Sequence, residues 1–502
     1  MKDAGAFLPD LPAERESRHG PLAQRDIGRV HEAALAVLER IGFANAPPSC
    51  AEALTRAGAV AGDDGRIRFP RALVLDTIAK AARRFTLCGQ EPRHDLAVQG
   101  PRAHFGTAGA AVHLVDIEAR DYRESRLADI YDAARIVDVM DNIHFFQRPM
   151  VARDMVDPAD LDLNTLYACV AGTAKHVGTS FSVRENVAAG LDLLHRVAGG
   201  EKKFRARPFV SNSNPFAASP LKFAANACGV LEACVEGGMP ILLLSTAQAG
   251  ATAPPALAGA LVQALAEVLA GLVYVNALKP GHPCILGTFP FACDPRSGAM
   301  AGGSAAQALM TAACGQMARF YDLPGGSAAG MADAKLPDVQ SGYEKGVTET
   351  MAALSGLSMV YEAAGMHASL GGFCLESLIV DNDMIGECLA CARGIAVSDE
   401  ALSVEAIAGA CLGGPGHYLG HGHPPATPCA RQPAFADRLG VKEWLEAGRP
   451  DMLQRAAAEK RRILGSHCPR HVRRETDEAL RARHPNIHLP RSAGIRRSCR
   501  CR

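Results

Sequence analysis

Apolar and polar residues follow two alternating periods along most of this chain. Short, nearly continuous apolar runs, typical of strands buried on both faces, are each followed by a longer stretch with apolar residues at helical spacing. The apolar runs cover residues 143–150, 176–183, 209–214, 240–246, 284–289, 325–330, 358–363 and, more weakly, 417–419. The helical stretches cover residues 161–170, 185–197, 221–235, 255–278, 303–320, 338–354 and 381–396.

This alternation predicts an α/β fold, a (β/α)8 TIM barrel. A doubly wound sheet is the competing architecture, but no G-x-G-x-x-G motif opens the first strand–helix unit. Residues 1–125 are predicted to form an N-terminal extension of helices and hairpins, and residues 126–465 the barrel. Residues 466–502 are predicted to form a C-terminal helical segment and a basic tail.

Composition narrows the class of protein. The 502 residues carry 53 basic and 53 acidic side chains, which gives no electrostatic case for a nucleic-acid or membrane partner. The 16 cysteines are scattered singly, apart from Cys388 and Cys391, and indicate reduced thiols. The most apolar window, 256–278, contains Gln263 and Glu267 and predicts a buried barrel helix. With no apolar signal core near residue 1, a cytoplasmic location is expected.

A polar cluster follows the apolar run at 325–330. Asp333 lies in the turn after this run, and Gln340, Tyr343 and Glu344 lie at the start of the next helix. Turns that follow parallel strands lie at the face of a barrel where active sites are built. Helix capping and surface ion pairs would explain each residue separately, but the whole cluster favours a site.

Other candidates come from neighbouring turns. His367 and Glu376 follow the run at 358–363, Phe289 and Phe291 follow the run at 284–289, and Arg184 follows the run at 176–183. Aromatic rings mixed with a few carboxylates suit an organic cation, held by ring faces and an acidic group. No nucleophile elbow and no Walker loop occurs in the sequence, so acyl transfer and nucleotide chemistry have no specific support.

A histidine-rich run suggests a metal site at first sight. His417, His421 and His423 lie close together in GHYLGHGH. Their spacing in a glycine-rich loop does not place them on one helix face, and a turn with exposed imidazoles is the simpler interpretation. No metal site is therefore predicted.

The order of several longer motifs resembles a known family. The motifs are GATAPPALAGALVQALAEVLAGL (250–272), KPGHPCILGTF (279–289), CDPRSGAMAGGS (293–304), ARFYDLPGG (318–326), DAKLPDVQSGYEK (333–345), ESLIVDNDMIG (376–386), GGPGHYLGHGH (413–423) and WLEAGRPDMLQRA (444–456). Each motif alone is modest, but their order resembles the trimethylamine:corrinoid methyltransferase superfamily. The resemblance spans about residues 20–484 and is to members without pyrrolysine, of the glycine betaine methyltransferase type.

The resemblance implies a (β/α)8 barrel that takes a methyl group from a methylamine or a quaternary amine. The acceptor would be Co(I) of a separate corrinoid-binding protein, so no tightly bound cofactor is expected; a homo-oligomer is compatible with it. The trimethylamine enzymes carry pyrrolysine near the position of Gly330 and Met331, where this chain has ordinary residues. This difference favours a quaternary amine such as a betaine as the methyl donor.

Roles for the candidates follow from this chemistry. Asp333 and Glu376 are expected to stabilise the cation, and Gln340 and Tyr343 to orient it. His367 is expected to hydrogen-bond the substrate or to shield the departing amine. Arg153, Arg184 or backbone amides would hold a betaine carboxylate.

Two departures from the family pattern leave other functions open. The chain has Ala306 where the family often has an acidic residue, and Pro424 after His423 where the family has threonine. One alternative is a barrel that binds an amine or a partner without catalysis. Another is an unrelated barrel lyase or hydrolase that uses His367 and Glu376 as acid and base.

Overall fold

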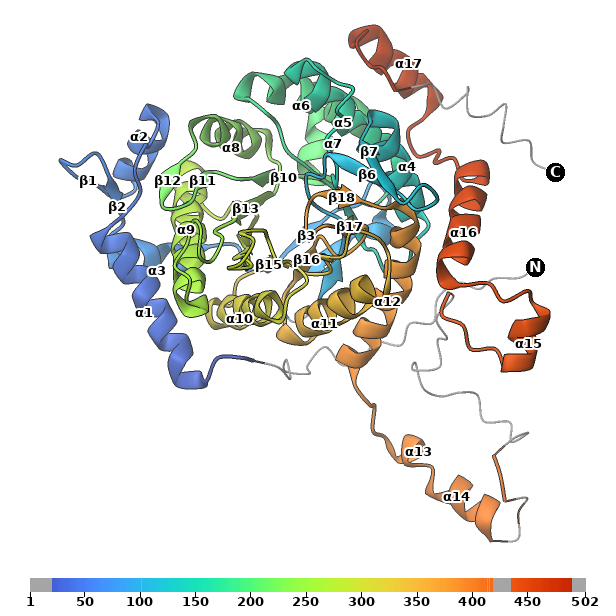
Figure 1. The fold of residues 1–502 in the computed structure, drawn as a ribbon. Helices are drawn as coiled ribbons and strands as arrows, with labels where there is room; N and C mark the ends of the chain where they lie inside the picture. The colour runs from blue at the N-terminus through green and yellow to red at the C-terminus, as the bar shows by residue number, and fades with distance from the viewer. Residues whose placement is uncertain (1–19, 101, 413, 415, 419–434, 490–502) are drawn as a thin grey trace.

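The apolar runs pair with one another as parallel strands, because each connection between them is long enough to hold a helix. The computed structural model describes residues 20–100, 102–412, 414, 416–418 and 435–489. Eight strands form one sheet in their order along the chain (Figure 1), and a parallel backbone bridge between Gly106 and Phe145 joins the first strand to the second. The sheet therefore closes into the predicted (β/α)8 barrel.

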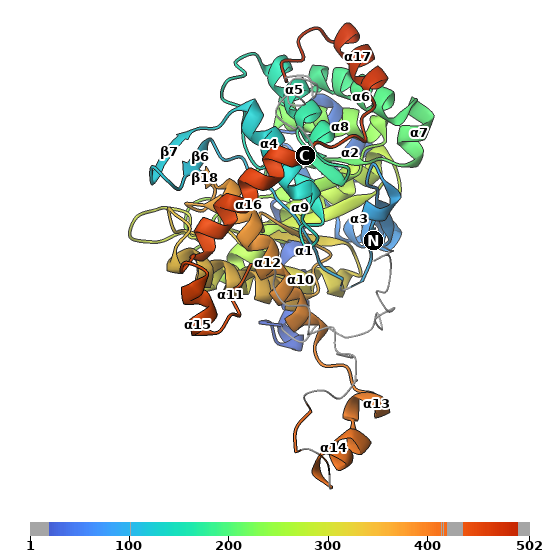
Figure 2. The same ribbon diagram turned by 90° about the vertical axis from the view of Figure 1, so that its right-hand side faces the viewer.

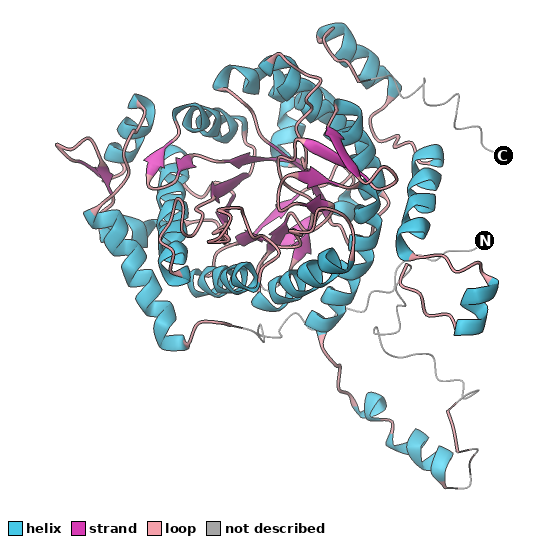
Figure 3. Ribbon diagram, in the orientation of Figure 1, coloured by secondary structure: helices cyan, strands magenta, loops and turns pink. Residues whose placement is uncertain are grey.

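The helices lie outside the strands as a ring (Figure 3). The barrel strands are β5 (His104–Phe105), β8 (Phe145–Gln147), β9 (His176–Thr179), β10 (Val210–Asn214), β13 (Ile241–Ser245), β14 (Cys284–Thr288), β15 (Gly325–Ala328) and β16 (Met359–Tyr361). The helices that follow them are α4 (Leu127–Asp138), α5 (Pro158–Gly172), α6 (Arg184–Ala198), α8 (Ala225–Gly237), α9 (Leu257–Leu278), α10 (Ala305–Tyr321), α11 (Val339–Ser355) and α12 (Leu375–Arg393).

Three boundaries differ from the sequence prediction. The weak eighth strand at 417–419 was wrong for residues 417 and 418, which are not in a strand, and residue 419 lies outside the described part. The missing strand is β5, which is too short to show as an apolar run and places the start of the barrel before residue 126. Helix α12 begins at Leu375, so Glu376, expected in a loop, lies in its first turn.

Segments outside the barrel cover its side and its two ends. Helices α1 (Gln24–Arg40), α2 (Pro48–Arg56) and α3 (Arg71–Lys80) pack against α9, and α16 (Met452–Ser466) packs against α12 and α4. Strand β18 (Gly372–Phe373) pairs with β17 (Met366–His367) and with β6 (His113–Asp116), and β6 pairs with β7 (Asp121–Glu124). Figure 2 shows β6, β7 and β18 together at one side of the molecule. This small sheet thus joins the connections after β5 and β16, which are neighbouring barrel strands.

The remaining elements are short hairpins and peripheral helices. They are β1 (Val60–Ala61), β2 (Ile67–Arg68), β3 (Phe85–Leu87), η1 (Pro92–His94), β4 (Leu96–Val98), α7 (Glu201–Ala206), β11 (Ala217–Ala218), β12 (Lys222–Phe223), α13 (Asp399–Leu402), α14 (Val404–Cys411), α15 (Val441–Glu446) and α17 (Arg474–Arg483). Helices α13 and α14 lie away from the barrel in both Figure 1 and Figure 2.

Helix α9 shows how an apolar helix with polar residues in its middle fits this fold. Among the described residues it is the one helix long and apolar enough to cross a membrane, but 78% of its most apolar window is buried inside the protein. Glu267 is fully buried and accepts hydrogen bonds from Ser245 Oγ (2.6 Å), Ser219 Oγ (2.7 Å) and the Leu221 amide (3.1 Å). The prediction of a buried barrel helix is confirmed.

Close backbone packing inside the barrel gives a first testable prediction. A Cβ at Gly287 of β14 would lie 2.1 Å from the Leu243 carbonyl oxygen of β13, and this backbone atom cannot move without distorting the sheet. Gly287→Ala should therefore lower the melting temperature. The matched control is Gly342→Ala in α11, where nothing lies within 4 Å of the added atom. That change should stabilise the helix by about 0.5–1 kcal/mol. Equal melting temperatures for the two variants would contradict the assigned register of β13 and β14.

Candidate functional site

An aromatic cluster lies inside the barrel, where β14 and β16 end and β8 begins. The ring of Tyr361 lies 5.0 Å from Phe145 and 5.6 Å from Phe289, and Phe289 lies 6.4 Å from Phe291 in an edge-on arrangement. All of these rings are buried. The structure thus brings together the two predicted phenylalanines and adds Phe145 and Tyr361, which lie in strands and which the sequence analysis did not select.

Glu362 is the most unusual acidic residue at this end of the barrel. It follows Tyr361 directly, is 5% exposed, and has a left-handed backbone (φ 64°). Its Oε2 is buried and has no hydrogen-bond partner among the described residues. Burial raises the pKa of Glu362 to about 8. An unpaired buried carboxyl at the end of a barrel strand is typical of a functional site. The available sequence signal was one charged residue inside the apolar run 358–363.

The predicted cluster after β15 does come together, as a hydrogen-bond network. Glu344 Oε2 accepts from the amides of Asp333 (2.7 Å) and Ala334 (3.2 Å), and Glu344 Oε1 accepts from Gln340 Nε2 (2.8 Å). Asp333 Oδ1 accepts from Ser369 Oγ at 2.5 Å. Glu344 Oε2 therefore holds the loop after β15, and Oε1 pairs with Gln340 one turn earlier in α11. Tyr343, which was predicted to orient the substrate, is 60% exposed.

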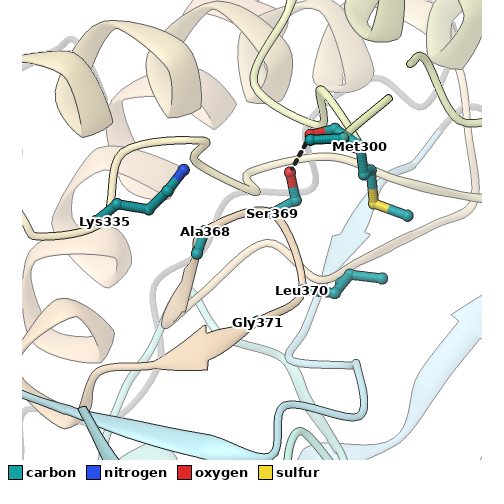
Figure 4. Close-up of a pocket in the computed structure, with 7 residues that line it drawn as sticks. Met300, Lys335, Ala368, Ser369, Leu370 and Gly371 are labelled. Atoms are coloured by element: carbon teal, nitrogen blue, oxygen red, sulfur yellow. Dashed lines mark hydrogen bonds between the residues drawn. The ribbon is translucent and has the colours of Figure 1, made fainter. Parts of the chain in front are cut away.

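A hollow of about 390 Å³ opens beside this network, between the loops after β14 and β15 and the turn between β17 and β18 (Figure 4). Its lining residues are Ala299, Met300, Lys335, Ala368, Ser369, Leu370 and Gly371. Ser369 Oγ also lies 2.9 Å from the Met300 carbonyl oxygen, and its single hydrogen can be donated either to that oxygen or to Asp333 Oδ1. This one side chain therefore lies in contact with all three loops. Lys335 Nζ donates to the Asp333 carbonyl oxygen at 2.6 Å.

His367 and Glu376 make contacts that differ from the predicted roles. His367 is fully buried and its Nε2 lies 2.8 Å from Ser377 Oγ; burial and, less strongly, Lys345 hold its pKa well below the usual value. It is therefore neutral at pH 7. Glu376 Oε1 forms an ion pair with Lys460 of α16, on the outer side of α12. This partner, distant in sequence, occupies the carboxylate that was predicted to hold a substrate cation.

Arg184 also lies away from the aromatic cluster. It begins α6 and pairs with Glu232 (2.8 Å) and Glu236 (3.3 Å) of α8, with 43% of its side chain exposed. Arg184 therefore forms ion pairs that connect α6 to α8. Arg148, which the sequence analysis did not select, lies at the end of β8 instead, and its Nε is buried without a partner among the described residues.

No group of three His, Cys, Asp or Glu side chains suited to a metal ion occurs in the part of the chain that the structure describes. His417 lies in a bend, and His421 and His423 lie outside the described residues. The prediction that no metal is bound stays a prediction.

Comparison with known proteins identifies relatives over nearly the whole chain. The family model described as trimethylamine methyltransferase (MTTB) matches residues 9–484. Trimethylamine methyltransferase MttB of Desulfitobacterium hafniense is 29% identical over 92% of this chain and 92% of its own length. Glycine betaine methyltransferase of the same species is 27% identical, over 93% and 96% of the two chains. In the solved structure of the Methanosarcina barkeri monomethylamine methyltransferase (MtmB), 79% of each chain superposes with a TM-score of 0.50 and 13% identity, which shows a shared fold.

Proposed function

Because this chain belongs to the trimethylamine methyltransferase (MTTB) family, we propose that it transfers a methyl group from a betaine-like quaternary amine to Co(I) of a separate corrinoid protein. The relatives include both a trimethylamine and a glycine betaine methyltransferase. The observation that carries the proposal is the aromatic cluster of Phe145, Phe289 and Tyr361, together with the unpaired carboxyl oxygen of Glu362, the residue that follows Tyr361 in the chain. Ring faces and a carboxyl are the groups that attract a quaternary ammonium ion.

A quaternary donor fits this site because its transfer needs no proton. The C–N bond breaks, its electron pair stays with nitrogen, and a neutral tertiary amine leaves. The partner's Co(I) supplies the nucleophile when the two proteins meet, and this chain holds the donor in line and excludes water. The buried rings of Phe289 and Tyr361 would both position the donor and exclude water.

Glu362 would respond to the charge of the donor. A fixed cation beside the carboxyl favours its ionised form and lowers its pKa from the value of about 8 in the free protein. Binding of a quaternary amine would then release a proton below pH 8. The ionised carboxyl would hold the ammonium group that the rings surround.

The position that carries pyrrolysine in trimethylamine enzymes supports this choice of donor. Gly330 has a left-handed φ of 79°, and a Cβ there would lie 2.5 Å from Glu349 Oε1 and 2.7 Å from the Ala363 Cα. No side chain fits at this residue. Met331 is fully buried.

A tertiary amine is the second candidate donor, and the protonation state of Glu362 is the observation that favours it. A methyl group leaves a tertiary amine readily only when nitrogen carries a proton. A carboxyl with a pKa of about 8 is protonated at neutral pH and could supply this proton.

An assay with a panel of donors decides between these reactions. The purified chain is mixed with a chemically reduced corrinoid protein and with glycine betaine, choline, trimethylamine or dimethylamine, and loss of the Co(I) absorbance is followed. We expect glycine betaine or a close analogue to be the active donor. Activity with trimethylamine alone would contradict the proposal. An amine-dependent rise in melting temperature without any methyl transfer would instead identify a binding barrel that has lost catalysis.

A further inference from the structure

The guanidinium group of Arg148 has few hydrogen-bond partners among the described residues. At the end of β8 its Nη1 donates to the Met150 carbonyl oxygen at 3.3 Å and its Nη2 donates to Ser180 Oγ at 3.2 Å. Both hydrogen bonds are long, and Nε is buried with no partner among the described residues. A guanidinium has five N–H donors, and a buried donor without a partner is costly; the Arg148 side chain is partly buried.

Other arginines in the segments that follow the barrel strands have an acidic partner, which Arg148 lacks among the described residues. Arg123 pairs with Asp129, Arg153 with Glu124, and Arg184 with Glu232. In the described part of the chain, Arg148 has no such ion pair. Cys169 and Asp162, both on α5, are close enough to act on its charge. The Asp162 carboxylate is already held by the Ser182 amide and by the Ser182 and Asn186 side chains. Burial lowers the pKa of Arg148, although an arginine remains charged.

Two serine hydroxyls extend this donor set across the next strands. Thr179 of β9 pairs with Asn212 of β10, so the following residues, Ser180 and Ser213, lie side by side. Asn214 donates to the Ala227 carbonyl oxygen of α8 and so faces outward; Ser213, one residue before it, faces the barrel interior. Ser213 Oγ is buried and has no hydrogen-bond partner among the described residues.

We propose that Arg148, with the hydroxyls of Ser180 and Ser213, binds the carboxylate of a zwitterionic substrate at the ends of β8, β9 and β10. The ammonium end of the same molecule would lie toward the aromatic cluster. This inference rests on the proposed function, and it narrows the donor from any quaternary amine to a betaine. Arg148 thereby replaces Arg153 and Arg184 as the carboxylate-binding residue.

Glycine betaine and choline provide the test, because both carry a trimethylammonium group and only betaine carries a carboxylate. Their affinities are measured by titration calorimetry on the full chain. We expect the wild-type protein to prefer betaine. Arg148→Gln should weaken betaine binding by about ten- to a hundredfold and leave choline binding unchanged. The matched control, Arg184→Gln, removes a guanidinium outside the site and should leave both affinities unchanged.

Further measurements separate this inference from the proposed function. Ser213→Ala, a small change that preserves packing, should weaken betaine binding severalfold without affecting choline, and tests the site if Arg148→Gln fails to fold. An unchanged ratio of betaine to choline affinity in both variants, or a wild-type protein without preference for betaine, would overturn the assignment of Arg148. Betaine binding that depends on Arg148 but supports no methyl transfer would keep the carboxylate site and reject the methyltransferase proposal.

Discussion

Glu362→Gln is expected to make the protein more stable at pH 8 and less active. The pKa of Glu362 is raised by burial to about 8 in the folded protein, from 4.5 for an ordinary glutamate. In the unfolded chain this carboxyl ionises as pH rises above 4.5, while in the folded protein it stays neutral until about pH 8. The stability that the neutral carboxyl allows is therefore fully present below pH 4.5 and is lost progressively up to about pH 8. The loss is on the order of a few kcal/mol.

Glutamine cannot ionise, so the variant should not share this loss. The difference in unfolding midpoint between Glu362→Gln and wild type should be small at pH 5 and large at pH 8. Glu236→Gln, at an exposed carboxyl on α8, is the control and should show no such growth with pH. The same Glu362→Gln protein should transfer methyl groups at least about tenfold more slowly. A parallel pH dependence for wild type and variant, or an unchanged rate with betaine, would show that Glu362 neither stays neutral nor acts at the site.

Lys345→Met is expected to cause the largest loss of stability. Lys345 Nζ lies 2.6 Å from Asp381 Oδ2 between α11 and α12, and the two side chains are 2% and 3% exposed. Asp381 Oδ2 also accepts the Gly365 amide at 2.7 Å. Burial and, less strongly, Asp381 hold the pKa of neighbouring Glu349 well above its usual value, which favours the neutral form of Glu349. The charge of Lys345 is therefore balanced by Asp381. Removing it leaves a buried anion unpaired, which costs about 3–5 kcal/mol.

A second substitution tests this explanation. Asparagine at position 381 is neutral and can still accept the Gly365 amide, so Lys345→Met combined with Asp381→Asn should recover much of the lost stability. Lys80→Met, which breaks an exposed pair with Asp76, is the control and should change the denaturation midpoint little. Wild-type stability in Lys345→Met would contradict the buried ion pair. Glu349 lies against Gly330, and Asp381 accepts a hydrogen bond from the Gly365 amide. Because these glycines lie in the turns after β15 and β16, loss of the Lys345–Asp381 pair should also slow catalysis.

The barrel and most of its strands could be predicted from the amino-acid sequence. A parallel strand covered by helices is apolar on both faces, so runs such as 241–245 and 284–288 stand out without knowledge of their neighbours. The cluster of Asp333, Gln340 and Glu344 was also predictable, because its partners lie within eleven residues of one another. Local spacing carries that information.

Which polar side chains are left without partners follows from contacts between residues far apart in the sequence. Glu376 meets Lys460, 84 residues away, and Arg184 meets Glu232, 48 residues away, so both side chains have partners that their strand-end positions did not suggest. Phe145 and Tyr361 meet only because the closing of the barrel brings the second and the last strands together on either side of β5, which is too short to be seen as a strand in the sequence. Glu362 and Arg148 are distinguished by one buried side-chain atom each, Oε2 and Nε, that has no hydrogen-bond partner among the described residues. That property depends on every neighbour in space, and therefore no spacing along the chain could have shown it.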